Sequence, residues 1–158
     1  MPINRRLMAF LYGLLLLLAG LAVQATPRIE TWETSKGARV LFVAAPDLPM
    51  LDARIVFQAG SARDNGQSGL ASLTADLLDQ GAGEWDADAI AERLEAVGAE
   101  LGIEAQRDMA SVSLRTLTRQ AAMDQALETL AAVIAGPRFA ASEFERVPAT
   151  VLIGLHRA

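Results

Sequence analysis

Alternating apolar and polar side chains along much of the chain predict strands. Residues 28–34 alternate in this way, and the apolar run 40–43 follows a turn signal at Lys36-Gly37, so that the two segments predict a β-hairpin. The same pattern predicts three further strands, at 53–60, 101–106 and 109–117. Half-polar strands of this kind are typical of an antiparallel sheet that is covered on one face.

A spacing of about 3.6 residues between apolar side chains predicts four helices. They are expected at 69–80, at 86–98, at 119–135 and from Ser142 onward. Asp86 is the predicted N-cap of the second helix, with Trp85 packed against Ile90, and Gly98 ends it. Ser142 is the predicted N-cap of the fourth, in a capping box. The third helix is expected to carry its apolar face at Met123, Leu127, Leu130 and Ile134.

The element order βββααββαα indicates an α+β fold, in which an antiparallel or mixed sheet carries helices packed on one face. The domain is expected to be incomplete at its C-terminus, because the chain stops at Ala158 inside the fourth helix, which Pro148 should already kink. Missing return strands would leave an unpaired sheet edge and uncovered apolar side chains, namely Leu70, Leu73, Leu127 and Leu130. We therefore expect the isolated chain to be insoluble or molten.

Residues 1–25 have the form of a secretory signal peptide. Two arginines precede an uncharged, mostly apolar run from Leu7 to Val23, and Ala25 is a small residue at the cleavage point. The alternative is an uncleaved inner-membrane anchor, although a helix of this length spans about 26 Å, less than a bilayer core of roughly 30 Å. In both cases residues 26–158 are expected to be exported, either periplasmic or secreted.

The composition excludes several classes of protein. The chain has no cysteine, which excludes disulfides and cysteine-ligated zinc or iron–sulfur sites. The 14 Lys and Arg residues face 19 Asp and Glu, for a formal net charge of −5, and loss of residues 1–25 would remove two arginines and no acid, giving −7. We expect such an acidic chain to bind no nucleic acid. No cofactor is expected either.

The segment from Ser68 to Gly81, SGLASLTADLLDQG, resembles the zinc-binding helix of the insulinase/pitrilysin (M16) metallopeptidases and their mitochondrial processing peptidase relatives. Other segments that resemble the family are the hairpin around Lys36-Gly37, the strand end 59–62, the helix end 94–101 and residues 139–152. The resemblance covers residues 28–157. It implies a LuxS/M16-like metallohydrolase half-domain, so that 26–158 would be a truncated N-terminal domain of the M16 type.

In the M16 family, a His-x-x-Glu-His motif on this helix binds zinc. The spacing matters because side chains at i and i+4 project from one helix face, where the glutamate polarises the attacking water. The resemblance places Ser72 and Asp76 at the two histidine positions, Ala75 at the position of the base and Ile153 at that of the remaining glutamate ligand. We therefore expect a degenerate motif, with no catalytic residue and no zinc, in a chain that is not an enzyme.

Two alternatives to an empty motif are open in the sequence. Ser72, Asp76 and Asp79 would share one helix face and could in principle bind a metal ion. A hydroxyl and carboxylates favour hard cations over tetrahedral zinc, however, so a hydrated helix face without a metal is the simpler interpretation. His156 is the one histidine of the chain and is expected at the surface. The glycines of the Gly81-Ala82-Gly83 segment are interpreted as a helix stop rather than a phosphate-binding loop.

The resemblance also implies a function in peptide degradation or processing. Bacterial members of the family often form two-chain enzymes, in which a subunit without the zinc motif closes a chamber with a zinc-bearing subunit, and this chain resembles that partner. The implied partners are a catalytic M16 subunit in a heterodimer and peptides held by pairing with a sheet edge. A membrane would be contacted only through an uncleaved N-terminal segment. The alternatives are a non-functional truncated gene product, a metallopeptidase with a nonstandard metal site at Asp76, and a membrane-tethered domain without a peptidase partner.

Overall fold

The computed structural model describes residues 27–147, which fall into two compact units divided after Pro46. The first unit is the predicted β-hairpin. Strands β1 (Ile29–Glu33) and β2 (Arg39–Val43) pair antiparallel, and the rings of Trp32 and Phe42 lie 6.3 Å apart on one face of the pair. The predictions for residues 1–25, Pro148, Ile153 and His156 lie outside the described residues.

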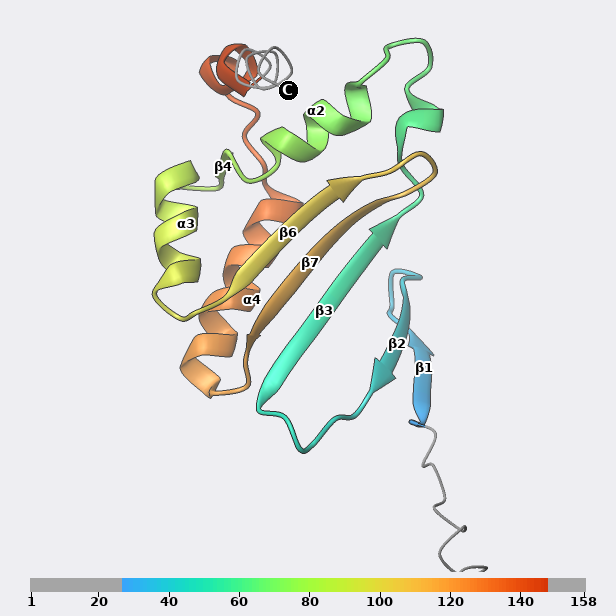
Figure 1. The fold of residues 1–158 in the computed structure, drawn as a ribbon, viewed down its shortest axis with the longest axis vertical. Coiled ribbons are helices and arrows are strands. Elements are labelled where there is room, and N and C mark those ends of the chain that lie inside the picture. The colour runs from blue at the N-terminus through green and yellow to red at the C-terminus, as the bar shows by residue number, and fades with distance from the viewer. Residues whose placement is uncertain (1–26, 148–158) are drawn as a thin grey trace, which may run out of the picture. The chain divides into compact units, whose positions relative to one another are not determined.

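A three-stranded antiparallel sheet forms the centre of the second unit (Figure 1). Its strands are β3 (Met50–Phe57), β7 (Ala110–Leu117) and β6 (Glu100–Ala105), with β7 in the middle. The three predicted strands are therefore confirmed, and β3 begins three residues earlier than the pattern predicted. Among residues 27–147 no strand pairs with the outer edge of β6.

The helices confirm the predicted α+β class. Helix α2 (Leu70–Leu77) contacts β6, whereas α3 (Ala87–Glu95) packs against α4 (Gln120–Ala135), which lies along β7. In Figure 1, α3 and α4 cover the same face of the sheet. Residues 141–147 are also helical. The sequence did not predict the short ladder of β4 (Gly81–Ala82) with β5 (Trp85–Asp86), which occupies the expected helix stop.

Local signals explain why α3 begins and ends where it does. The Asp86 carboxylate accepts a hydrogen bond from the Ala89 amide at 2.9 Å, which confirms Asp86 as the N-cap. At the other end Gly98 has a φ of 66°, and the Ala99 amide donates to the Leu94 carbonyl at 2.9 Å. This left-handed glycine and its hydrogen bond close the helix in the Schellman manner.

The core lies between the sheet and the α3–α4 pair. Val112 and Leu114 of the central strand are 3% and 1% exposed, and they belong to one buried cluster with Ala126, Leu130 and Val133 of α4. Register places Leu101 of β6 and Ala53 of β3 on either side of Leu114. The side chains that alternate with these on β7, beginning with Ser111 and Ser113, therefore belong to the helix-free face of the sheet.

The buried face of α4 is shifted by one residue from the apolar face that the sequence predicts. The buried residues of α4 are Ala122, Ala126, Thr129, Leu130 and Val133. Of the predicted set only Leu130 is buried, whereas Leu127 is 36% exposed. The reason is that the face toward the sheet is built on small side chains, Ala122 and Ala126, which permit close approach of the helix. Counting only large apolar residues missed this alanine stripe.

Two further predictions need correction. The Phe144 amide donates to the Ala140 carbonyl at 3.0 Å, so the helix at 141–147 starts from Ala140, and Ser142 lies within its first turn rather than at the N-cap. Four side chains were expected to be uncovered. Leu70 and Leu127 are exposed, at 44% and 36%, but Leu73 is half-buried and Leu130 is buried.

Thr116 is a polar side chain inside this apolar layer. It is 1% exposed, and its hydroxyl has no hydrogen-bond partner among the described residues. Because Val has nearly the same shape and removes the unpaired hydroxyl, we expect Thr116→Val to raise the free energy of unfolding by about 1 kcal/mol. Urea unfolding measures this change, with Thr118→Val as the exposed control on the same segment. A lower stability for Thr116→Val would show that the hydroxyl is satisfied.

Candidate functional site

Helix α2 carries the candidate motif, and a buried aspartate fixes its start. The two Asp64 carboxylate oxygens accept hydrogen bonds from the backbone amides of Gly69 at 2.9 Å and Ala71 at 3.0 Å. Asp64 is 7% exposed, and the formal N-cap, Gly69, makes no side-chain cap. A carboxylate at this end also complements the helix dipole. Sequence reasoning missed Asp64, because it precedes α2 by six residues and lies outside any capping pattern.

The turn that delivers Asp64 is attached to the sheet. After β3, the Ser61 and Ala62 amides donate to the carbonyls of Gln106 at 3.0 Å and Arg107 at 2.7 Å in the β6–β7 turn. Gly60 has a φ of 150°, and a Cβ there would lie 2.6 Å from the Gln106 carbonyl oxygen. A glycine is therefore required at this crossing. The α2 helix is positioned by hydrogen bonds to the strand pair, not by its own sequence alone.

The predicted motif residues lie on α2 as expected. Ser72 and Asp76 are exposed at positions i and i+4, and Ala75 is half-buried. Within residues 27–147, neither Asp76 nor Ser72 has a side-chain hydrogen bond or ion pair. Asp79 does not continue this face, because α2 ends at Leu77 and Asp79 accepts a hydrogen bond from the Gln80 side chain at 2.6 Å. The expected alignment of Ser72, Asp76 and Asp79 is therefore wrong for Asp79.

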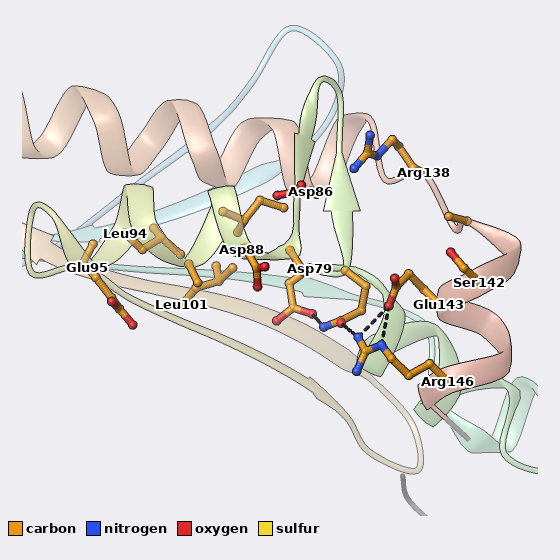
Figure 2. A pocket seen from close by; sticks show the side chains of 16 residues that line it. Asp79, Asp86, Asp88, Leu94, Glu95, Leu101, Arg138, Ser142, Glu143 and Arg146 are labelled. Carbon is orange, nitrogen blue, oxygen red and sulfur yellow. Dashed lines mark hydrogen bonds and ion pairs between the residues drawn. The ribbon is translucent and has the colours of Figure 1, made fainter. Parts of the chain in front are cut away.

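A groove of about 860 Å³ begins beside Asp79 (Figure 2). We call it the α3 groove. One wall is the outer side of α3, with Asp88 and Glu95, and Ala99 and Leu101 at the start of β6 line it as well. The opposite wall comes from residues 138–146. The groove does not include Ser72, Ala75 or Asp76, so the candidate motif and this hollow are separate features of the surface.

The arginines of the α3 groove are already engaged. Arg138 donates to the Trp85 carbonyl at 2.9 Å, and Arg146 forms an ion pair with Glu143 at 2.6 Å and bonds the Gln80 side chain at 2.5 Å. Asp86 caps α3, whereas Asp88 and Glu95 make no ion pair among the described residues. The carboxylates of Asp79, Asp88 and Glu95 therefore leave the groove with a negative wall. The apolar part beneath them includes Ile90 and Leu94, both largely buried.

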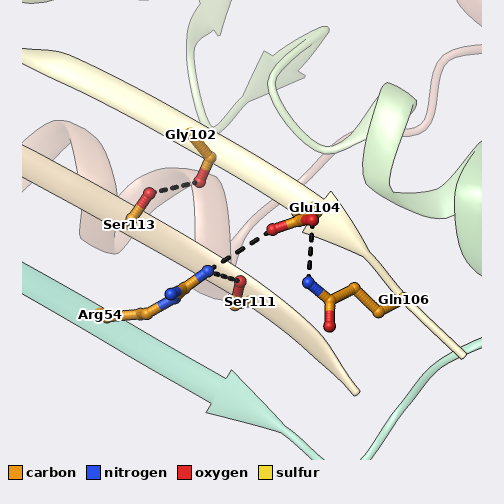
Figure 3. A network of polar contacts seen from close by, with 6 residues as sticks. All are labelled: Arg54, Gly102, Glu104, Gln106, Ser111 and Ser113. Carbon is orange, nitrogen blue, oxygen red and sulfur yellow. Dashed lines mark hydrogen bonds and ion pairs between the residues drawn. The ribbon is translucent and has the colours of Figure 1, made fainter. Parts of the chain in front are cut away.

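The helix-free face of the sheet is polar. Arg115 binds Asp52 through two hydrogen bonds, at 2.7 and 3.2 Å, and this exposed pair lowers the pKa of the Asp52 carboxyl through hydrogen bonding and charge. Nearby, Arg54 donates to Ser111 at 3.2 Å and reaches Glu104 at 3.5 Å, while Gln106 also bonds Glu104 (Figure 3). These contacts pair both arginines of the face but leave Glu100 without a hydrogen bond among the described residues.

Residues 27–147 contain no group of three or more His, Cys, Asp or Glu side chains placed to hold one metal ion. None of the helices in this range has both the length and the apolar character needed to cross a bilayer.

Comparison with known families identifies the fold. The sequence model of the family described as Insulinase (Peptidase family M16) matches residues 39–153. The chain belongs to the M16 peptidase family. The resemblance carried by the α2 segment and its surroundings is thereby confirmed. Among curated protein sequences, none matches this M16 chain.

Solved structures agree with this assignment. An inactive M16 peptidase domain from Pseudomonas fluorescens is similar with a TM-score of 0.79 and 40% identity, over 82% of this chain and 32% of that one. A protease from Helicobacter pylori has a TM-score of 0.69 at 19% identity, over 84% of this chain and 31% of its own. Pitrilysin is similar with a TM-score of 0.67 and 23% identity, over 78% of this chain and 13% of pitrilysin. The last two show the M16 fold alone, and the chain spans about a third of the first two proteins.

The donor set on α2 does not fit the zinc site of the M16 family. Zinc in proteins is held by thiolates, imidazoles and carboxylates in a tetrahedral set, and catalysis requires a group that polarises the bound water. At the motif positions this chain offers the Ser72 hydroxyl, the Ala75 methyl and one carboxylate, Asp76. Ile153, at the fourth position, lies outside the described residues. We therefore derive no catalytic step through zinc.

Proposed function

We propose that this chain is an exported, catalytically inactive M16 subunit, or part of one, that pairs with a zinc-bearing M16 subunit in peptide degradation or processing. The observation that carries the proposal is the contrast on α2. Asp64 fixes the start of the helix, yet the positions that would bind zinc offer only Ser72, Ala75 and Asp76. The similarity to the inactive Pseudomonas fluorescens domain supports the same conclusion.

A role in peptide binding fits the sheet. The outer edge of β6 (Glu100–Ala105) has no partner strand within residues 27–147, and an extended peptide adds to such an edge through main-chain hydrogen bonds. This mode needs no metal. An inactive subunit would thus retain the capacity to hold a substrate strand while its partner supplies the zinc and the attacking water.

The proposal is tested with the purified chain and a zinc-bearing M16 subunit from the same genome. Alone, the chain is expected to retain no stoichiometric Zn²⁺ after dialysis and to cleave no peptide. Mixed with the zinc-bearing subunit, it should co-elute on size exclusion and raise the rate of chelator-sensitive peptide cleavage. Export is tested separately, by cell fractionation.

Two outcomes would contradict parts of this proposal. Chelator-sensitive cleavage by the chain alone, lost in Asp76→Ala but kept in the control Asp124→Ala on α4, would establish a nonstandard metal site. No effect on the zinc-bearing subunit, together with separate elution, would remove the pairing and leave the fold as the established property.

A further inference from the structure

Within residues 27–147 the outer edge of β6 has no partner strand, and carboxylates flank this edge on both faces of the sheet. On the helix side, the α3 groove runs beside Leu101 and presents Asp88 and Glu95 from α3. On the helix-free side, Glu100 and Glu104 project from β6 itself, because side chains alternate along a strand. A strand added at this edge would therefore place its own alternating side chains beside negative groups on either face.

The arginines near the edge do not neutralise these groups. Arg146 is held by Glu143 and Gln80 across the α3 groove, and Arg138 is bound to the Trp85 carbonyl. On the other face Arg115 of β7 lies opposite Glu100 in register and interacts with its charge, although its guanidinium is hydrogen-bonded to Asp52. Glu104 lies 3.5 Å from Arg54. These arginines therefore offset the charge of Glu100 and Glu104 only in part, whereas Asp88 and Glu95 make no ion pair among the described residues.

We propose that the β6 edge with the α3 groove selects extended peptide segments that carry lysine or arginine. This inference rests on the proposed peptide-binding function and adds the charge class of the peptide. Main-chain pairing with β6 would supply the sequence-independent part of the affinity. Asp88 and Glu95, at i and i+7 on α3, lie about 10.5 Å apart along the helix. Side chains two residues apart in the added strand lie on the same face about 7 Å apart, and long lysine or arginine side chains can span the difference to contact both carboxylates.

The test uses three fluorescent peptides of alternating threonine and valine that differ at two positions, two residues apart. These positions hold lysines, glutamines or glutamates, and binding to the full chain is measured by fluorescence anisotropy. The lysine peptide should bind roughly three- to tenfold more tightly than the glutamine peptide, as expected for two exposed ion pairs, and the glutamate peptide more weakly than both. The lysine preference should shrink at high salt.

A double variant locates the effect. Asp88→Asn with Glu95→Gln should abolish most of the lysine preference and leave binding of the glutamine peptide unchanged. The matched control is Glu84→Gln with Glu92→Gln, which removes the same charge from exposed acids outside the α3 groove and should keep the preference. Circular dichroism spectra of both variants establish that the helices are intact.

The outcomes separate this inference from the function on which it rests. Equal affinity for the lysine and glutamine peptides would overturn the charge preference while leaving peptide binding at β6 in place. Equal loss of the preference in both double variants would also overturn it, because the attraction would then come from the net charge of the whole chain. If none of the three peptides binds, the proposed peptide-binding function fails and the inference fails with it.

Discussion

Replacing Leu114 by alanine should lower the free energy of unfolding by about 3–4 kcal/mol, the largest effect expected for any single truncation in this chain. Leu114 lies in the central strand, is 1% exposed and packs in the buried cluster between the sheet and α4. Its neighbours in register, Ala53 and Leu101, belong to strands on both sides, so the surrounding backbone has little freedom to close the cavity.

The measurement is urea unfolding of the full chain followed by circular dichroism. Leu117→Ala is the matched control, because Leu117 ends the same strand and is 39% exposed, so its truncation should change stability by less than about 1 kcal/mol. Similar losses in both variants would contradict a packed core at Leu114. The measurement requires a sharp transition in the parent chain, and such a transition would itself overturn the expectation of an insoluble or molten chain.

How far the sequence predicts the fold depends on how local the signals are. Asp86 and Gly98 act on backbone groups within a few residues of themselves, so the start and end of α3 were predictable. The face of α4 was not, because alanine is compatible with both the surface and a close helix–sheet contact. Only the tertiary structure shows that Ala122 and Ala126, rather than Leu127, approach β7.

The candidate site also has one part that the sequence predicts and one part that only the tertiary structure shows. Ser72, Ala75 and Asp76 could be placed from the sequence, because a helix fixes their spacing once its span is known. The α3 groove could not be predicted, since its walls come from the end of α2, from α3, from β6 and from residues 138–146. No periodic pattern in the sequence brings Asp79 and Glu95 to one hollow.

Two parts of α2 contribute differently to the fold, namely the exposed positions Ser72 and Asp76 and the start of the helix, which Asp64 holds. Substitution at Ser72 or Asp76 should cost the fold little, because both side chains are exposed. Loss of Asp64 would instead leave two helix amides without an acceptor. We therefore expect the exposed motif positions and Asp64 to respond very differently to substitution.

Asp64→Ala should lower the free energy of unfolding by about 2–3 kcal/mol, because it removes two hydrogen bonds from a buried carboxylate to the Gly69 and Ala71 amides. Asp64→Asn keeps one acceptor oxygen and should lose about half as much. Asp76→Ala, on the exposed face of the same helix, is the control and should stay within about 0.5 kcal/mol of the parent.

Urea unfolding measures the global effect of Asp64→Ala, and hydrogen exchange measures the local one. Exchange of the Gly69 and Ala71 amides should accelerate strongly in Asp64→Ala, while amides in the middle of β7 change only as far as global stability does. If Asp76→Ala destabilised the chain as much as Asp64→Ala, then the exposed face of α2 would be held by contacts outside residues 27–147. The motif positions would then be structural, and their divergence from the zinc-binding pattern would follow from packing rather than from the loss of a metal.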